Sequence, residues 1–218
     1  MENTNYKLNA KLKSRCITWQ QYQQSIHALC SKMEDTEFDY ILGIFQGGYI
    51  VAQSIADFYP DVKIGGIKAG EENGIFFTDE ICGDRDLSGK RVLLVDEVVE
   101  SGNTLIFCKK MLTEKYAANV KTACMYLYAN SRAKTDYYSE LFEEKQNMIF
   151  PWRYLRDMLS MLDEVMSGKC WYDVEEIADN IRNAFKMELP QKQILKHLMS
   201  NNSIFVCDDG KWRKIDEL

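Results

Sequence analysis

The chain has 218 residues, of which 46% are hydrophobic and 28% are charged, and its formal net charge is −6. This composition is ordinary for a globular protein and allows one large domain plus a small appendage. The acidic balance argues against a nucleic-acid binder, because neutralising phosphates requires concentrated Lys and Arg, but it leaves open a small anionic substrate held by backbone amides and a metal ion.

The first part of the chain alternates helix and strand patterns. Apolar residues recur at three- and four-residue spacing over residues 18–33, which predicts an amphipathic helix. Residues 40–45 form an apolar run typical of a buried strand, Gly47-Gly48 marks a turn, and residues 49–58 repeat the helical spacing. Strand, glycine turn and helix in this order indicate an α/β domain.

The middle of the chain continues this alternation around one long connection. A strand is predicted over residues 62–69, and a polar, glycine-punctuated stretch follows over residues 70–88. Connections this long in a compact domain are usually functional lids or disordered excursions, and we expect one of the two there. A buried strand over residues 91–95, a helix over 104–116 and a strand over 120–129 complete the pattern.

The last part of the chain changes to helical character. A short strand is predicted over residues 148–150 and a helix over 153–166, followed by two helical patterns and a hairpin around a glycine turn, over residues 174–184, 190–199, 204–207 and 212–215. Two helices followed by a hairpin suggest a winged-helix-like module. We therefore expect one domain over residues 1–168 and a small module over residues 169–218.

Charge and targeting features indicate where the protein works and what it contacts. Residues 171–218 hold nine acidic against seven Lys and Arg residues, which favours a protein partner for the module over DNA. The sequence has no run of about 18 apolar residues, and its N-terminus is polar, so we expect no membrane contact and a cytoplasmic location. Seven scattered cysteines without a C-x-x-C pair indicate reduced thiols.

The segment from Val92 to Leu105, which reads VLLVDEVVESGNTL, carries the most specific chemistry. Asp96 and Glu97 come at the carboxyl end of a buried strand, where open α/β sheets bind ligands. The small-residue turn that follows enters a helix, so backbone N–H groups converge on a phosphate-binding point. Carboxylates beside such a cradle suit a sugar phosphate, because they accept hydrogen bonds from ribose hydroxyls and help to orient Mg²⁺.

This segment resembles the phosphoribosyl pyrophosphate (PRPP) signature of type I phosphoribosyltransferases, and the order of elements over residues 40–152 is similar to that family. The resemblance implies an α/β fold of the type I phosphoribosyltransferase kind, with a central parallel sheet flanked by helices and a hood loop. The segment Phe150-Pro151-Trp152 and the Asp136-Tyr137-Tyr138 segment before it resemble the bacterial and archaeal purine (xanthine and hypoxanthine) phosphoribosyltransferases most.

The resemblance also implies roles for the motif residues. Asp96 and Glu97 would bind the ribose hydroxyls and, with PRPP oxygens, Mg²⁺, while Glu100 would be the acid/base beside the base. These three carboxylates would be the catalytic residues. The 5′-phosphate would be held by the turn that consists of Ser101, Gly102, Asn103 and Thr104.

Two further segments complete the site that the resemblance implies. Gln46, Gly47 and Gly48 occupy the place of the pyrophosphate loop, where backbone amides meet the leaving group. Phe150 and Trp152 would bind the nucleobase, although plain core aromatics are an equal alternative for these two side chains.

The family's activity implies an enzyme of nucleotide salvage that transfers 5-phosphoribosyl from Mg-PRPP to a nucleobase, expected to be a purine, and releases pyrophosphate. Members of this family are commonly homodimers, and we expect one here.

A second interpretation is a catalytically weak or inactive PRPP- or nucleotide-binding regulatory protein that acts through its C-terminal module. It is suggested by Gln46, where purine enzymes commonly have Arg or Lys, and by the absence of a Lys from residues 126–130. Glu100 and the long hood favour the enzyme.

Overall fold

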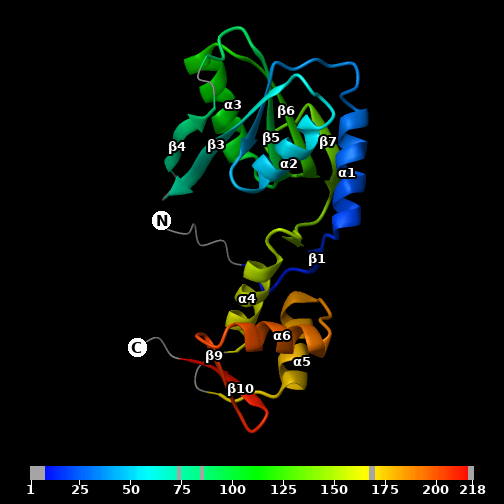
Figure 1. Ribbon diagram of the computed structural model, residues 1–218, viewed down its shortest axis with the longest axis vertical. Coiled ribbons are helices and arrows are strands. Elements are labelled where there is room, and N and C mark those ends of the chain that lie inside the picture. The colour runs from blue at the N-terminus through cyan, green and yellow to red at the C-terminus, as the bar shows by residue number, and fades with distance from the viewer. Residues whose placement is uncertain (1–7, 73–74, 84–85, 167–169, 216–218) are drawn as a thin grey trace. The chain divides into compact units, whose positions relative to one another are not determined.

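The computed structural model describes residues 8–72, 75–83, 86–166 and 170–215 (Figure 1). The chain divides into two compact units, one of residues 20–145 and the other of residues 1–19 and 146–218. We call the first the sheet unit and the second the C-terminal unit. Within the described ranges, no helix is both long and apolar enough to cross a membrane.

The sheet unit is built on a six-stranded sheet in the order β4-β3-β2-β5-β6-β7. Every pairing in it is parallel except β3 with β4. The strands are β2 (Tyr40–Ile44), β3 (Lys63–Glu72), β4 (Ile75–Cys82), β5 (Arg91–Val99), β6 (Asn119–Tyr128) and β7 (Tyr137–Phe142). A mainly parallel sheet flanked by helices confirms the predicted α/β class.

Helices cover both faces of this sheet (Figure 1). Helix α3 (Asn103–Tyr116) buries Leu105, Cys108 and Leu112 against the face that carries Leu42 and Leu94. These three residues recur at the spacing of one helix face, which is why residues 104–116 were predicted to be helical. The buried apolar contacts of α3 fix where the loop before it enters the helix.

The opposite face carries α1 (Trp19–Ser31) and α2 (Gly47–Ala56). Helix α2 crosses close to β2 at Gly43, where an added Cβ would lie only 2.3 Å from Cα of Tyr49. Helix α1 packs on α2 through Tyr22, whose hydroxyl is 2.6 Å from Oγ of Ser54. The glycine therefore allows α2 to approach the sheet, and α1 fixes α2 from outside.

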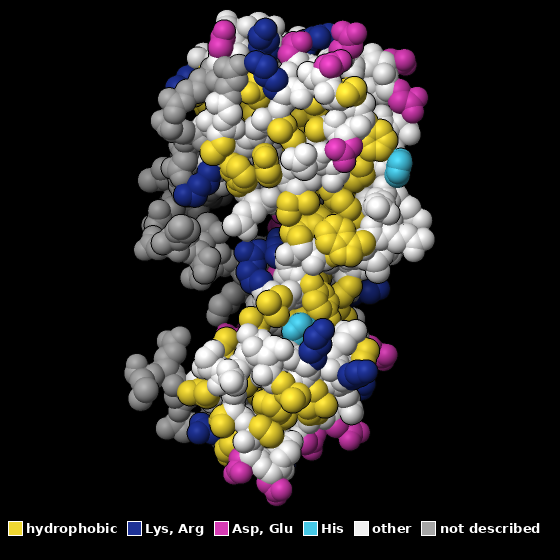
Figure 2. Space-filling model, viewed as in Figure 1, with side chains coloured by type: hydrophobic (Ala, Val, Ile, Leu, Met, Phe, Trp, Pro, Cys, Tyr) yellow, Lys and Arg dark blue, Asp and Glu magenta, His cyan; other side chains and the backbone are white. Residues whose placement is uncertain are grey.

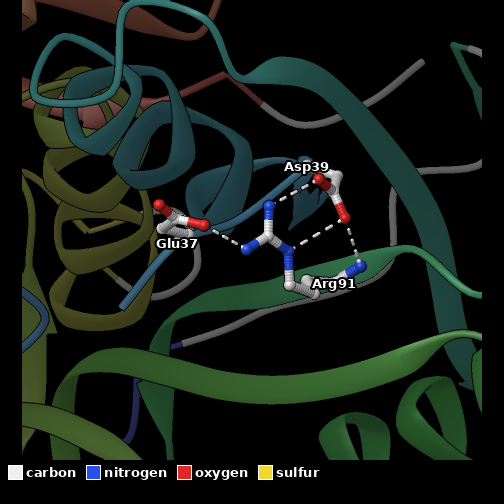
Figure 3. A network of polar contacts seen from close by, with 3 residues as sticks. All are labelled: Glu37, Asp39 and Arg91. Atoms are coloured by element: carbon white, nitrogen blue, oxygen red, sulfur yellow. Dashed lines mark hydrogen bonds and ion pairs between the residues drawn. The ribbon is translucent and has the colours of Figure 1, made fainter. Parts of the chain in front are cut away.

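The starts of β2 and β5 are tied together by a charged network (Figure 3). Arg91 donates from Nη2 to Oδ1 of Asp39 at 2.8 Å, from Nε to Oδ2 at 3.2 Å, and from Nη1 to Glu37 at 2.5 Å. The backbone amides of Asp39 and Arg91 add hydrogen bonds of 2.9 and 2.8 Å across the same pair. This network lies at the amino ends of the strands and fixes the register in which Tyr40 faces Val92.

The stretch that was predicted to be a hood loop, residues 70–88, is largely a β-hairpin. Strand β3 continues to Glu72, and β4 returns antiparallel to it, with pairs from Glu72–Ile75 to Gly66–Cys82. The strand predicted to end at residue 69 is therefore longer, because the antiparallel partner extends its ladder of hydrogen bonds. Residues 73–74 and 84–85 of this stretch lie outside the described residues.

The C-terminal unit combines two small sheets with three helices, all predicted from the sequence except its first strand. Strands β1 (Ser14–Cys16) and β8 (Asn147–Ile149) pair in parallel. They are accompanied by α4 (Tyr154–Val165), α5 (Val174–Phe185), α6 (Gln191–Ser200) and the hairpin of β9 (Phe205–Asp208) and β10 (Lys211–Lys214). On the face seen in Figure 2, hydrophobic side chains of this unit gather toward its middle, and acidic side chains lie mostly along its lower edge.

The core of the C-terminal unit joins α4 to the later helices. Met161 and Leu162 of α4 are buried in one apolar cluster with Ile177, Phe185 and Leu198. The compact unit thus includes residues 146–166, whereas the sequence placed them in a domain that ends at residue 168. The winged-helix-like character of residues 169–218 stays a prediction.

Candidate active site

Strand β5 reaches further than the sequence suggested and carries the acidic pair within it. The predicted strand ended at Val95, but β5 continues to Val99, where it still pairs with Leu127 of β6. Strand β2, in contrast, pairs with β5 only as far as Gly43–Val95. The β2-facing edge of β5 is therefore left uncovered by β2 at Asp96 and Glu97, at the carboxyl end of the sheet.

The start of α2 packs against this part of β5. A Cβ on Gly47 would lie 2.1 Å from Cδ of Glu97, and a Cβ on Gly48 would lie 2.9 Å from Cα of Asp96. The two glycines are needed for this close approach. Gln46, which precedes them, is exposed, and the peptide bond before it is cis. The predicted pyrophosphate loop and the predicted ribose-binding carboxylates thus come together, although Gly48 and Asp96 are far apart in the sequence.

The carboxyl of Asp96 is perturbed by its surroundings. Oδ1 of Asp96 accepts a hydrogen bond of 2.9 Å from the backbone amide of Glu97. Burial raises the pKa of Asp96 well above its usual value, and the neighbouring carboxyl of Glu97 raises it further. A cation beside this carboxyl would favour the ionised form of Asp96.

The pair fits Mg²⁺ that is shared with a phosphorylated ligand. Mg²⁺ prefers oxygen donors and is often held by one or two carboxylates together with substrate phosphates. No group of three or more His, Cys, Asp or Glu side chains among the described residues is arranged to hold a metal by itself. Asp96 and Glu97 would therefore supply the protein oxygens, and ligand and water oxygens would complete the coordination.

The turn after β5 presents backbone donors at the start of α3. Gly102 has φ of +78°, and a Cβ on it would lie 2.4 Å from Cβ of Ala133, so a glycine is required for both reasons. The amide of Arg132 donates to the carbonyl of Ser101 at 3.0 Å and supports the turn from behind. Across the described ranges, the amides of Gly102 and Thr104 donate to no protein acceptor. They are available to a phosphate, as helix amino ends generally are.

A pocket of about 310 Å³ lies beside this turn. It is lined by Glu100, Ser101, Asn103, Asn130, Arg132 and Lys145. Lys145 forms an ion pair with Glu100. The sequence analysis missed Lys145, because it follows β7 outside any motif and only its contact with Glu100 identifies it.

The two predicted base-binding aromatics belong to the C-terminal unit, whereas the other predicted site residues belong to the sheet unit. The rings of Phe150 and Trp152 are stacked, with centroids 4.6 Å apart and planes at 19°. Phe150 is fully buried, while Trp152 is partly exposed. Trp152 is therefore the better placed of the two to meet a ligand, and contact with a base stays a prediction for both.

The chain is similar to known phosphoribosyltransferases in sequence and in fold. The phosphoribosyl transferase domain family matches residues 18–157, more than half of the chain. The xanthine-guanine phosphoribosyltransferase of Chromohalobacter salexigens is 27% identical over 141 residues, which are 62% of this chain and 82% of that protein. The match to the family ends inside α4 and leaves the later helices and the β9–β10 hairpin uncovered.

Solved structures show the same relationship. The purine phosphoribosyltransferase of Pyrococcus horikoshii has a TM-score of 0.59 and 28% identity, over 65% of this chain and 94% of that one. The xanthine-guanine-hypoxanthine phosphoribosyltransferase of Helicobacter pylori shares the fold, with a TM-score of 0.57 and 18% identity over 67% of this chain and 99% of that one. The chain therefore belongs to the phosphoribosyl transferase domain family and is a phosphoribosyltransferase of the type I fold, similar to relatives named as purine enzymes.

Proposed function

We propose that the chain transfers 5-phosphoribosyl from Mg-PRPP to a purine base and releases pyrophosphate. In this proposal the amides of Ser101, Gly102, Asn103 and Thr104 hold the 5′-phosphate, while Asp96 and Glu97 bind the ribose hydroxyls and Mg²⁺. The purine assignment is supported by relatives named as purine and xanthine-guanine phosphoribosyltransferases, at 28% and 27% identity.

One observation carries the proposal: the glycines that start α2 pack directly on the acidic pair of β5. Gly47 lies against the carboxyl of Glu97, and Gly48 lies against the backbone of Val95 and Asp96. The pyrophosphate end and the ribose end of one PRPP molecule have to be bound side by side, with the cation between them. The convergence of two sequence-distant segments supports such a ligand better than a phosphate site alone would.

The chemistry follows from these positions. Bound Mg²⁺ would neutralise the departing pyrophosphate, and the loop Gln46–Gly48 would donate amides to it. Positive charge that develops on the sugar at C1′ would be stabilised by the nearby carboxylates. Glu100, which follows β5 beside the phosphate turn, would exchange a proton with the base. The β3–β4 hairpin is the candidate hood that limits hydrolysis of the reactive sugar.

A panel assay tests the proposal. The protein is incubated with Mg-PRPP and, separately, hypoxanthine, guanine, xanthine, adenine, uracil, orotate or nicotinic acid, and pyrophosphate release is followed. We expect turnover with at least one of the purines and none with the pyrimidines. Tight Mg-PRPP binding without turnover of any base would contradict the proposal and favour the regulatory alternative, in which the uncharged Gln46 reflects lost catalysis.

The remaining parts of the proposal concern the assembly. We propose a homodimer that works in the cytoplasm, with the C-terminal residues 169–218 available to a protein partner. Sedimentation of the full chain at two protein concentrations tests the dimer. A monomer at both concentrations would contradict it.

A further inference from the structure

The aromatic ring of Phe45, the residue before the loop Gln46–Gly48, packs directly on a glycine of the neighbouring strand. A Cβ added to Gly66 of β3 would lie 2.3, 2.4 and 3.0 Å from three atoms of that ring, which are the nearest atoms it would meet. Gly66 is buried, and Phe45 is partly exposed. We propose that Phe45 is a positioning residue, which holds the pyrophosphate loop in its binding geometry through this contact with Gly66.

Two glycines side by side in the sheet leave room for this arrangement. Gly43 of β2 and Gly66 of β3 are partners in the parallel register, so side chains at the two positions would point to the same face of the sheet. On this face Gly43 admits the backbone of α2 at Tyr49, and Gly66 admits the ring of Phe45. The ring also contacts that of Tyr49, with centroids 4.9 Å apart. Phe45 thus packs against both β3 and the first turn of α2.

The backbone of Phe45 is fixed to the same strand as its ring. Its amide donates to the carbonyl of Ile67 at 2.8 Å, directly after Ile44–Ile67, the last register pair of β2 and β3. Main chain and side chain of Phe45 therefore both contact β3 just before the chain enters the loop. The position of the loop depends on β3 in this way, although β3 contributes no residue to the predicted site.

The chemistry of the loop makes its exact position important. Gln46 carries no charge, so the loop meets pyrophosphate with amide groups and with the amino end of α2 rather than with a cation. Hydrogen bonds from amides weaken steeply with distance and angle, whereas the attraction of a full charge depends less on direction. A loop of this kind needs a firm support, and the contact of Phe45 with Gly66 supplies one.

The contact is tight enough to be tested with one methyl group. Carbon atoms in ordinary contact lie about 3.5–4.0 Å apart, so a Cβ on Gly66 would require the ring of Phe45 to move by about 1 Å or more. Gly66 does not have a positive φ, so alanine introduces no backbone strain there. The variant Gly66→Ala therefore acts mainly through the ring.

This inference rests on the proposed function, which assigns pyrophosphate to the loop Gln46–Gly48, and its test separates the two. The variants Gly66→Ala, Phe45→Ala and their combination are compared with the wild type and with Phe58→Ala. Phe58 follows the far end of α2, is 45% exposed and contacts the ring of His27, with centroids 5.2 Å apart. For each protein, calorimetry gives the Kd of Mg-PRPP, of Mg-pyrophosphate and of ribose 5-phosphate, which carries the 5′-phosphate without pyrophosphate.

We expect each single variant to raise the Kd of Mg-PRPP and of Mg-pyrophosphate on the order of 10-fold, because small displacements of binding groups have effects of this size or larger. The Kd of ribose 5-phosphate should change less than about twofold, since separate sites with no shared contacts rarely couple. The double variant should bind Mg-PRPP no more weakly than Phe45→Ala, because without the ring the added methyl group displaces nothing. Phe58→Ala should behave as the wild type.

Three results would overturn the inference and leave the proposed function standing. The first is an unchanged Kd of Mg-pyrophosphate in both single variants. The second is an equal loss of ribose 5-phosphate binding, which would show a general disturbance of the sheet. The third is an additive loss in the double variant, which would show that Gly66 does not act through the ring. A wild type that binds neither Mg-PRPP nor Mg-pyrophosphate contradicts the proposed function itself and overturns the inference with it.

Discussion

Glu97 occupies the space that a side chain at Gly47 would need: an added Cβ would lie 2.2 Å from its Oε1. The first turn of α2 and the acidic pair of β5 therefore form one surface, and neither can be changed without affecting the other. This contact joins the predicted pyrophosphate loop to the predicted ribose site.

Replacing Gly47 by alanine tests the importance of this contact. The Cβ would displace the carboxyl of Glu97, and because that carboxyl ends a flexible side chain, the fold should persist. We expect Mg-PRPP affinity to fall at least tenfold, which corresponds to about 1.4 kcal/mol, with little change in the thermal midpoint. Calorimetric titration and thermal unfolding measure the two effects.

The matched control is Gly89→Ala. Gly89 has φ of +68° and nothing within 4 Å of an added Cβ, so the variant should lose about 1–2 kcal/mol of stability from backbone strain. It should bind Mg-PRPP as the wild type does. Equal PRPP affinity for Gly47→Ala and wild type would show that Gly47 is not part of the PRPP-binding site.

At neutral pH, Asp96 should lower the stability of the fold while it contributes to the binding of Mg-PRPP. Its folded-state pKa is raised by burial and by Glu97, so its stabilising contribution is complete below the ordinary value of 3.8 and is lost as pH rises through the folded value. Asp96→Asn cannot ionise at this position and does not lose stability in this way. The free energy of unfolding of Asp96→Asn, measured in urea, should therefore exceed that of the wild type by an amount that grows as pH rises. Its Mg-PRPP affinity should fall by about 1–3 kcal/mol, the cost of a lost charged partner. Unchanged PRPP affinity would refute the binding role of Asp96.

The Asp39–Arg91 pair should show the opposite dependence on pH. Hydrogen bonds from Arg91 lower the pKa of Asp39 to about 2, so its stabilising contribution is present above 3.8 and is lost as pH falls through about 2. The stability difference between wild type and Asp39→Asn should therefore shrink between about pH 4 and pH 2, and also in high salt, since the pair is partly exposed. A difference that stays constant on acidification would show that the charge of Asp39 is unimportant.

A buried ion pair in the C-terminal unit allows a test of stability. Asp157 is 1% exposed and accepts from Nε of Arg153 at 3.2 Å, while Nη2 of Arg153 donates to the carbonyl of Met148 at 2.9 Å. Arg153→Met leaves the buried carboxyl without its cation and should cost about 3–5 kcal/mol in urea unfolding. Arg153→Met combined with Asp157→Leu should recover most of that loss. A double variant as unstable as the single one would show that the loss of stability does not come from the unpaired carboxyl of Asp157.

Much of the fold could be predicted because local periodicity and burial agreed. The helical spacing over residues 104–116 corresponds to α3, and the apolar run over residues 40–45 corresponds to β2. Strands β1, β4 and β7 escaped the sequence analysis, β4 because it lies in the polar stretch of residues 70–88 that was predicted to be a hood loop. Strand β1 is short and exists through its pairing with β8, and β7 is half-buried at the edge of the sheet, so its pattern is weak. The continuation of β5 to Val99 was hidden by the charges of Asp96 and Glu97.

The candidate site was predictable where its residues are adjacent in the sequence. Asp96, Glu97 and the turn to Thr104 follow one another, and chain order alone places them at the carboxyl end of a parallel strand. The contact of Gly47 with Glu97 and the pairing of Lys145 with Glu100 depend on how distant segments fold together. No local pattern marks Lys145, so only the structure could identify it.

A crystal structure with Mg²⁺ and PRPP tests the central claim most directly. The account predicts that the 5′-phosphate oxygens lie within hydrogen-bond distance of the amides of Gly102 and Thr104, with the ribose hydroxyls on Asp96 and Glu97. A phosphate bound elsewhere, with those two amides donating to protein acceptors, would contradict it.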